Sequence, residues 1–114
     1  MGGREAPNRA GCARAVKPLQ ISEPASLELS EAVRWYEERR PGWGGRLFDA
    51  VARTLVLIES YPEIGSQRRG RVPARQLKVR GFPYVVAYRI RPDDVYIVAV
   101  AHTSRRPGYW KQRS

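Results

Sequence analysis

The sequence contains a single cysteine, Cys12, and a single histidine, His102. One cysteine forms neither an internal disulfide nor a cysteine-based zinc site. No group of Asp and Glu residues at ligand spacing accompanies His102, so the sequence offers no ligand set for a catalytic metal. We therefore expect a protein that uses no metal and no other cofactor.

Long apolar segments are also missing. The longest apolar run covers residues 95–101, whereas a helix needs about 20 apolar residues to cross a bilayer. Residues 1–17 scatter arginines among Gly, Ala and Pro without the apolar stretch of a secretory signal. We expect a cytoplasmic protein with no membrane contact, built as a disordered extension over residues 1–16 and one domain over residues 17–114.

Acidic residues are scarce in the second half of the chain. Residues 61–114 hold twelve basic and three acidic residues, a net charge of +9, whereas residues 17–60 carry a net charge of −1. A surface that serves only solubility intersperses the two signs. The asymmetry therefore predicts an anionic partner, either nucleic acid or an acidic protein.

Two segments of the first half have helical periodicity. In residues 26–39 apolar side chains recur at positions 29, 32, 33 and 36, with Ser26 as the predicted N-cap. In residues 43–60 the apolar stripe consists of Leu47, Val51, Leu55 and Ile58. Trp35, Tyr36 and Trp43 are predicted to pack within this region. Pro41 and Gly42 end the first helical segment, and the second begins directly after them. Two helices joined by so short a connection are expected to form an antiparallel hairpin.

Strand patterns flank this hairpin. The segments 16–21, 75–80, 82–90 and 95–101 alternate or are rich in Val and Tyr, and residues 62–73 carry the Pro and Gly of a loop. Tight turns join the last three strands into an antiparallel meander. The predicted order is β-α-α-β-β-β, an α+β fold in which an antiparallel sheet packs one face against the helical hairpin.

The strand pattern also predicts where charge lies. Leu77 and Val79 alternate with Lys78 and Arg80, so helices that cover the apolar pair leave the two cations on the open face. Arg89 on the next strand joins them. The prediction is a concave basic sheet flanked by residues 102–113, although the same cations also suit the plain solvated side of a half-buried strand.

Three segments carry a resemblance to a known family. They are EAVRWYEE at 31–38 followed by RPGWG at 40–44, FPYVVAYR at 82–89, and AVAH at 99–102 followed by RRPGYW at 105–110. In this order and spacing they resemble the RelE/ParE superfamily, the toxins of type II toxin–antitoxin systems that are often labelled plasmid stabilisation proteins. The resemblance covers residues 17–110, and the helix and the FPY strand look more like ParE.

The resemblance implies a partner and a target. The partner is an acidic cognate antitoxin, ParD-like or similar, that forms a hetero-oligomer with the toxin. ParE-like members poison DNA gyrase and are not known as catalysts, and this is the first interpretation. RelE-like members are ribosome-dependent endonucleases that cleave messenger RNA, which is the alternative. A non-toxic nucleic-acid-binding module would use the same basic face and is a third interpretation.

Metal-free RNA cleavage would require a base, cations at the phosphate and an acid. The candidate catalytic residues are Lys78, Arg80, Arg89, Arg105, Arg106 and Tyr109. The same residues together with Trp110 are the candidates for binding nucleic acid or a partner, and Arg105 and Arg106 also suit antitoxin carboxylates. His102 is the one plausible base. Alternation places it with Tyr96, Val98 and Val100, toward the helices, so the sequence leans toward a protein that is not an enzyme.

Overall fold

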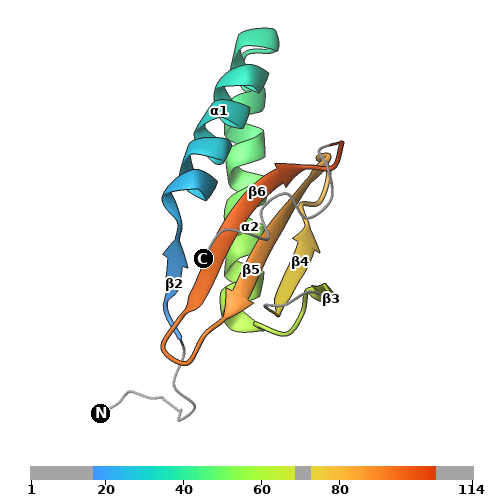
Figure 1. The fold of residues 1–114 in the computed structure, drawn as a ribbon. Coiled ribbons are helices and arrows are strands. Elements are labelled where there is room, and N and C mark those ends of the chain that lie inside the picture. Colours follow the sequence, from blue (N-terminus) through green and yellow to red (C-terminus); the bar gives the residue numbers. More distant parts are fainter. Residues whose placement is uncertain (1–16, 69–72, 105–114) are drawn as a thin grey trace, which may run out of the picture.

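The computed structural model describes residues 17–68 and 73–104 of the chain. In chain order they form β2 (Leu19–Ile21), α1 (Glu23–Arg39), α2 (Trp43–Ser60), β3 (Ser66–Arg68), β4 (Ala74–Lys78), β5 (Tyr84–Ile90) and β6 (Val95–His102). The strands form one five-stranded sheet in the order β2-β6-β5-β4-β3, with the helical hairpin on one side of it (Figure 1). The predicted α+β fold is confirmed. Neither of the two described helices is long and apolar enough to span a membrane.

Helix α1 begins earlier than the sequence pattern predicts. Ser22, not Ser26, is the N-cap, and its Oγ accepts a hydrogen bond from the backbone N–H of Ala25 at 3.2 Å. Pro24 lies in the first turn of the helix, where an N–H group would have no helical partner. The Ser22 hydroxyl also donates to the carbonyl of Val98 at 3.1 Å. This side chain therefore fixes the start of α1 against β6.

The two helices approach each other closely at Gly44. A Cβ atom at this position would lie 2.7 Å from the carbonyl oxygen of Val33 on α1. Gly42, the N-cap of α2, has no side chain to cap the helix. The carboxylate of Glu37 on α1 supplies that cap, because it accepts hydrogen bonds from the N–H groups of Gly42 and Gly44 at 3.0–3.1 Å. Acceptors at a helix N-terminus satisfy otherwise unpaired N–H groups.

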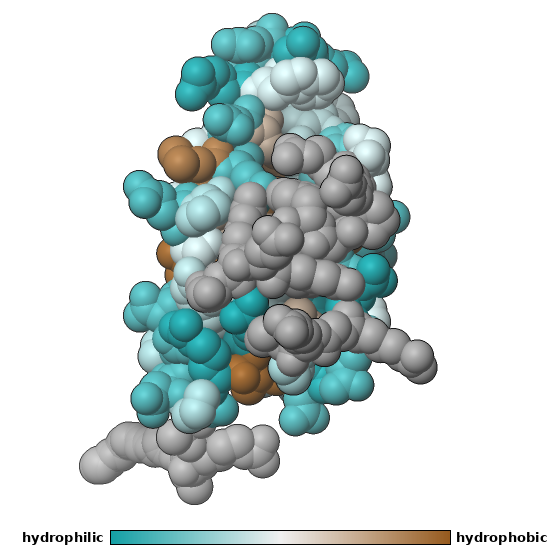
Figure 2. Space-filling view, viewed as in Figure 1, coloured by the Kyte–Doolittle hydropathy of each residue, from teal (hydrophilic) through white to brown (hydrophobic). Residues whose placement is uncertain are grey.

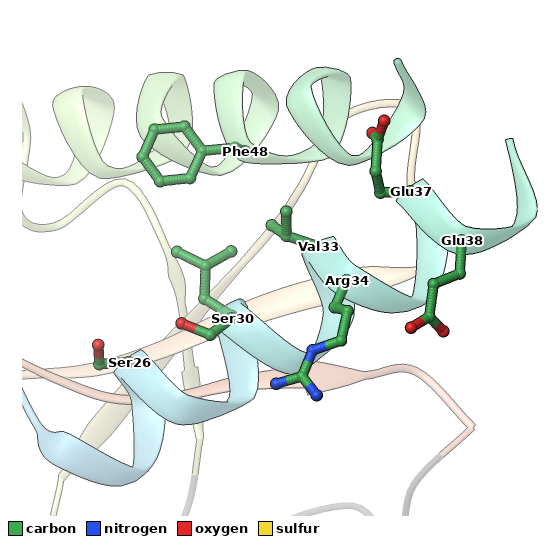
Figure 3. Close-up of a pocket in the computed structure, with 8 residues that line it drawn as sticks. Ser26, Ser30, Val33, Arg34, Glu37, Glu38 and Phe48 are labelled. Atoms are coloured by element: carbon green, nitrogen blue, oxygen red, sulfur yellow. The ribbon is translucent and has the colours of Figure 1, made fainter. Parts of the chain in front are cut away.

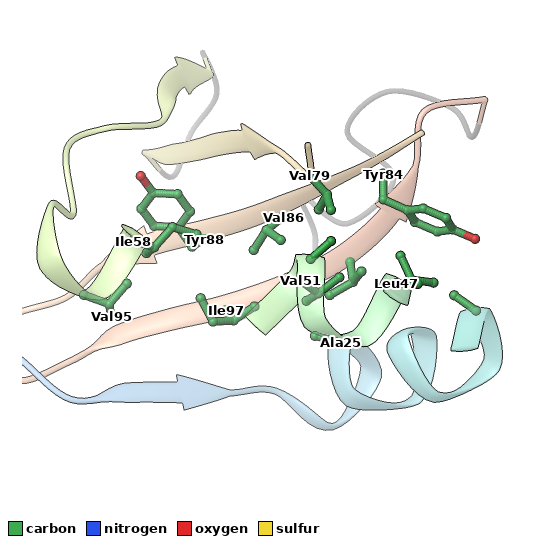
Figure 4. Close-up of a cluster of buried hydrophobic side chains, with 13 residues drawn as sticks. Ala25, Leu47, Val51, Ile58, Val79, Tyr84, Val86, Tyr88, Val95 and Ile97 are labelled. Carbon is green, nitrogen blue, oxygen red and sulfur yellow. The ribbon is translucent and has the colours of Figure 1, made fainter. Parts of the chain in front are cut away.

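The apolar stripe of α2 forms the centre of the core. Leu47, Val51 and Ile58 are fully buried, and they lie against the helix-facing side of the sheet with Val86 and Ile97 (Figure 4). A buried side chain of this size contributes about 1.5–3 kcal/mol to stability relative to an exposed one. Leu55 is partly buried beside them. The stripe predicted from the sequence is therefore confirmed.

Two of the three aromatic residues predicted to pack in this region do so. Tyr36 and Trp43 contact the ring of Phe82 edge-on, with centroids 5.5 and 6.1 Å apart. Trp35 differs from the prediction, because 49% of it remains exposed. The Arg39 guanidinium lies 3.9 Å from the centroid of its ring. Trp35 is thus a surface residue of α1.

The sheet is mixed, although the sequence predicts an antiparallel one. Strands β4, β5 and β6 form the expected antiparallel meander. Strand β2 pairs in parallel with β6, with Leu19 opposite Val95 and Ile21 opposite Ile97. Parallel neighbours need a long crossover, and the helical hairpin together with the strands that follow it provides that length. Val16, which was predicted to belong to this strand, lies outside the described residues.

The segment predicted as a loop contains the short strand β3, which pairs antiparallel with β4. Its sequence Ser-Gln-Arg has no apolar residue, so no alternation marks it as a strand. The Tyr88 hydroxyl holds this segment in place, because it donates to the carbonyl of Pro62 at 2.7 Å and accepts from the N–H of Gly65 at 2.9 Å. Burial raises the pKa of Tyr88, which favours the protonated phenol that this donor role requires.

A β-bulge in β6 breaks the alternation that the sequence suggests. Ala87 pairs with Ala99, but Tyr88 pairs with Ile97, so Val98 is the extra residue. As a result Ile97 lies on the helix-facing side together with Val100 and His102. Tyr96 and Val98 lie on the opposite side. The predicted grouping of His102 with Tyr96 and Val98 is therefore wrong, although its grouping with Val100 is right.

The close contact at Gly44 leads to a first prediction. Replacing Gly44 by Ala should destabilise the domain by about 1–3 kcal/mol, because the added methyl group forces the helix backbones apart. Gly45 is the matched control, since it is its neighbour in the same helix and a Cβ there meets nothing within 4 Å. Gly45→Ala should stabilise by about 0.5–1 kcal/mol. Urea denaturation measures both, and equal effects of the two substitutions would contradict the close contact.

Candidate partner-binding surfaces

The sheet face opposite the helices, here called the open face, is apolar at its centre. Ala74, Ala87, Val98, Ala99 and Ala101 are buried in a second cluster, with Val85 and Tyr96 packed against it. The predicted row of polar alternates is therefore wrong for the central residues of β5 and β6, which are apolar on both faces, as in strands covered on both sides. Most side chains around the margin of this face are hydrophilic, with a few apolar ones at the left and lower edges of the view (Figure 2).

The three cations predicted for the sheet do not converge on one point. Lys78 lies opposite Val85 and Arg89 lies opposite Tyr96, so both are on the open face as predicted. The step from Val85 to Arg89 is four residues along β5, which is about 13 Å at about 3.3 Å per residue. Arg80 is not in a strand, because β4 ends at Lys78 and Arg80 lies exposed in the turn before β5. The predicted concave basic sheet is thus split into two ends.

The end of the open face near the β5–β6 turn carries three arginines. Arg68 pairs with Ala74, and Arg89 pairs with Tyr96. Since Arg75 pairs with Tyr88, Ala74 lies opposite Arg89. These four residues therefore form one row across the sheet. The Arg91 guanidinium lies 4.2 Å from the centroid of the Tyr96 ring. We call Arg68, Arg89, Arg91 and Tyr96 the basic end. The sequence pattern missed Arg68, since only the pairing of β3 brings it there.

Four predicted site residues cannot be placed. Arg105, Arg106, Tyr109 and Trp110 lie outside the described residues. Their roles in binding a partner, a phosphate or a base remain predictions.

His102 lies on the helix-facing side, as predicted. Its ring contacts the ring of Tyr84 edge-on at 5.1 Å, and it lines a cavity beside Glu28 and Glu31 of α1. The backbone N–H of Ser104 donates to its Nδ1 at 3.0 Å. An Nδ1 that accepts carries no hydrogen, so the donor nitrogen of this ring is Nε2. The sheet separates this ring from Lys78 and Arg89.

A groove of about 550 Å³ runs along the outer side of the helical hairpin. Phe48 of α2 and Val33 of α1 line it, with Ser30 and Arg34 on the α1 side (Figure 3). Phe48 is 52% exposed. Its position beside the buried stripe was visible in the sequence, but nothing there distinguishes an exposed phenylalanine from one that completes the core.

The chain matches a known family and is similar to several known proteins. The family described as "ParE toxin of type II toxin-antitoxin system, parDE" matches residues 19–107. A protein named Toxin RelE3 from Caulobacter vibrioides is 22% identical over 91 residues, which is 80% of this chain and 99% of that protein. A solved structure titled "Chromosomal ParDE TA system from P. aeruginosa" has a similar fold, with a TM-score of 0.67, 16% identity, and coverage of 76% of this chain and 96% of the matched chain.

The basic end contains one ion pair whose titration can be tested. Arg91 Nε and Nη2 donate to the Asp94 carboxylate at 2.5 and 2.6 Å, and this hydrogen bonding lowers the pKa of Asp94 below its usual value. A carboxyl group whose pKa is lowered in the folded state stabilises the fold at pH values above its unfolded-state pKa. This contribution to stability is lost as the pH falls through the folded-state pKa. NMR titration of the carboxyl carbon should show a lowered pKa that returns toward its usual value in Arg91→Gln. An unchanged midpoint in that variant would contradict the pairing.

Proposed function

The chain belongs to the ParE toxin family of type II toxin–antitoxin systems, and from this premise we propose that it poisons DNA gyrase without being a catalyst and is held inactive by an acidic antitoxin. A ParE-type action needs a binding surface and no catalytic base. Family membership also favours a toxin over a non-toxic nucleic-acid-binding module.

The position of His102 is the observation that carries this proposal. General-base catalysis requires the base to lie within hydrogen-bond reach of the proton that it removes. His102 is on the helix-facing side of the sheet, whereas Lys78 and Arg89 are on the open face. Among the strand residues described on the open face there is no His, Asp or Glu. Among these described strand residues, none that could act as a base therefore accompanies Lys78 and Arg89 on the open face.

The charge and shape of the open face support an acidic protein as the antitoxin. Arg68 and Arg89 flank the small residue Ala74, and arginine is well suited to pairing with carboxylates in two parallel hydrogen bonds. The apolar groove at Phe48 offers a second contact, where apolar side chains of the same antitoxin would be buried. The residues Arg105 and Arg106 are proposed to add to the basic contact.

A ribosome-dependent nuclease is the second candidate function. The relative named Toxin RelE3 favours it by name, and Lys78, Arg89, Arg105 and Arg106 supply cations that such a reaction needs. The groups that would act as base and acid on the open face would then have to come from outside the residues described here, with Tyr109 as the candidate acid.

The target can be tested directly with the purified full chain. We expect it to inhibit gyrase supercoiling or to trap gyrase-cleaved DNA, while messenger RNA on translating ribosomes stays intact by primer extension. Arg89→Ala should weaken the gyrase effect, and Arg53→Ala on the exposed side of α2 should not. Messages cut within codons, with gyrase unaffected and with cleavage slowed on the order of 10²-fold by Arg89→Ala, would reverse the choice in favour of the nuclease.

The antitoxin can be tested by growth and by affinity. Expression of the chain alone should arrest growth, and co-expression of its acidic antitoxin should restore growth. Arg68→Gln should weaken antitoxin binding about tenfold at low salt and less at high salt, because salt screens charges at a surface. Arg53→Gln removes the same charge from α2 and should leave the affinity within twofold. Free growth with the chain alone would count against the toxin.

A further inference from the structure

The centre of the open face is buried, although both described helices lie on the other side of the sheet (Figure 1). Three residues of its apolar cluster, Ala87, Val98 and Ala99, have no exposed surface. The partly buried residues that pack against this cluster, Val85 and Tyr96, belong to the same two strands. Among the helices and strands that the structure describes, none lies over the cluster.

Ala99 shows that this cluster needs cover from above. Its partner on β5 is Ala87, and the next residue on the same face of β6 is Ala101. A methyl side chain ends one carbon above the backbone, so neighbouring methyl groups leave each other open on the side away from the sheet. The complete burial of Ala99 therefore requires further protein atoms over this face. Large rings suit such a shallow floor, because protein interiors are packed with few voids.

Three segments of the chain lie outside the described residues, namely 1–16, 69–72 and 105–114. Residues 69–72 connect β3 to β4 at one edge of the sheet. Ala99 on β6 lies two strands away from β4, which is about 10 Å at about 4.8 Å per strand. Four residues span at most about 14 Å, which is too short to cross that distance and return. This connection therefore does not cover Ala99.

Residues 1–16 join the domain at the end of the sheet that carries the β5–β6 turn. Lys17 Nζ donates to the carbonyl of Arg91 in that turn at 2.9 Å. The segment contains no aromatic residue, and Gly, Ala and Arg make up most of it. It therefore offers little apolar surface to bury against the cluster.

The chain leaves β6 at the other end of the sheet, close to the cluster. Thr103 and Ser104 form a turn directly after the strand. The N–H of Thr103 donates to the carbonyl of Pro83 at 2.9 Å, which holds this turn beside the start of β5. Ala101, a member of the cluster, is two residues before the turn. Residues 105–114 therefore begin next to the surface that has to be covered.

The spacing of the aromatic residues in 105–114 matches the position of the cluster. Five residues separate Ser104 from Tyr109, and five separate Ser104 from Ala99. Both stretches reach about 17 Å when extended. A segment that reverses direction after Ser104 thus brings Tyr109 and Trp110 level with Ala99. Rings of this size bury a large area of apolar surface.

We propose that residues 105–114 fold back over the open face and that the aromatic pair Tyr109 and Trp110 covers Ala99 and Ala87. The sheet then has a layer of protein on both sides, as strands that are apolar on both faces require. This inference concerns the fold of the chain, so it holds for either target considered above.

The same arrangement bears on partner binding. Four cations belong to the segment: Arg105, Arg106, Lys111 and Arg113. Long basic side chains lay their stems along apolar surface and keep their charges in water. An acidic antitoxin that pairs with these cations binds the cover of the sheet rather than the bare strands.

NMR of the purified full chain tests the cover directly. Ring protons of Tyr109 or Trp110 should show nuclear Overhauser effects to the methyl groups of Ala87 and Ala99, because such effects arise only between protons that lie close together. The ring currents should also shift the Ala99 methyl resonance. The double variant Tyr109→Leu, Trp110→Leu should move that resonance toward its ordinary position. Trp35→Leu removes a half-exposed ring from α1 and should leave it unchanged.

Thermal unfolding of full-length variants provides a second measurement. The double variant Tyr109→Ala, Trp110→Ala should lower the melting temperature by roughly 10 °C, because it uncovers the apolar centre of the open face. Trp35→Ala is the matched control on α1, and we expect it to change the melting temperature by less than about 3 °C.

Three results would overturn the proposal. The first is a wild-type chain in which residues 105–114 show no Overhauser effects to Ala87 or Ala99. The second is that these methyl groups show effects to residues 1–16, or only to a differently labelled second copy, which assigns the cover to that segment or that copy. The third is an equal melting temperature for the double alanine variant and the Trp35→Ala control. None of these measurements involves the antitoxin or the target, so the proposed function is tested separately.

Discussion

Helices α1 and α2 form one apolar surface because Gly44 allows their backbones to meet and Glu37 closes the start of α2. This contact fixes the angle of the hairpin, and the hairpin in turn determines what each helix covers. Helix α2 lays Leu47, Val51 and Ile58 on the sheet. Helix α1 is left beside β6, where Ser22 and Glu28 bind its backbone. The cavity beside His102 and the groove at Phe48 are both consequences of where this contact places α1.

The sequence was sufficient to predict the elements in which burial of one side alone determines the pattern of apolar residues. The α2 stripe and the alternation of Leu77 with Lys78 arise from burial on one side, and both hold in the structure. The start of α1 was misjudged because Pro24 marks both the end of a strand and the first turn of a helix. Strand β3 has no apolar residue, and the parallel pairing of β2 depends on contacts distant in sequence. Neither strand β3 nor the parallel pairing of β2 is therefore marked by a pattern in the local sequence.

The candidate site was less predictable than the fold. Alternation placed Lys78 and Arg89 on the correct face, but periodicity does not say how far apart they lie along it. The apolar centre of the open face was missed because alanine is compatible with either side of a strand. His102 was oriented correctly although the bulge at Val98 interrupts the alternation behind that prediction. A local insertion of this kind is invisible without the partner strand.

The short edges of the sheet bear on how a free toxin behaves in the cell. In the described part of the chain both edge strands, β2 and β3, have only three residues, and the next stretch of edge on β6 is occupied by Ser22 and Glu28. Sheets with such edges resist pairing with other copies. A free toxin molecule therefore offers other copies little backbone edge to pair with, which limits edge-to-edge aggregation.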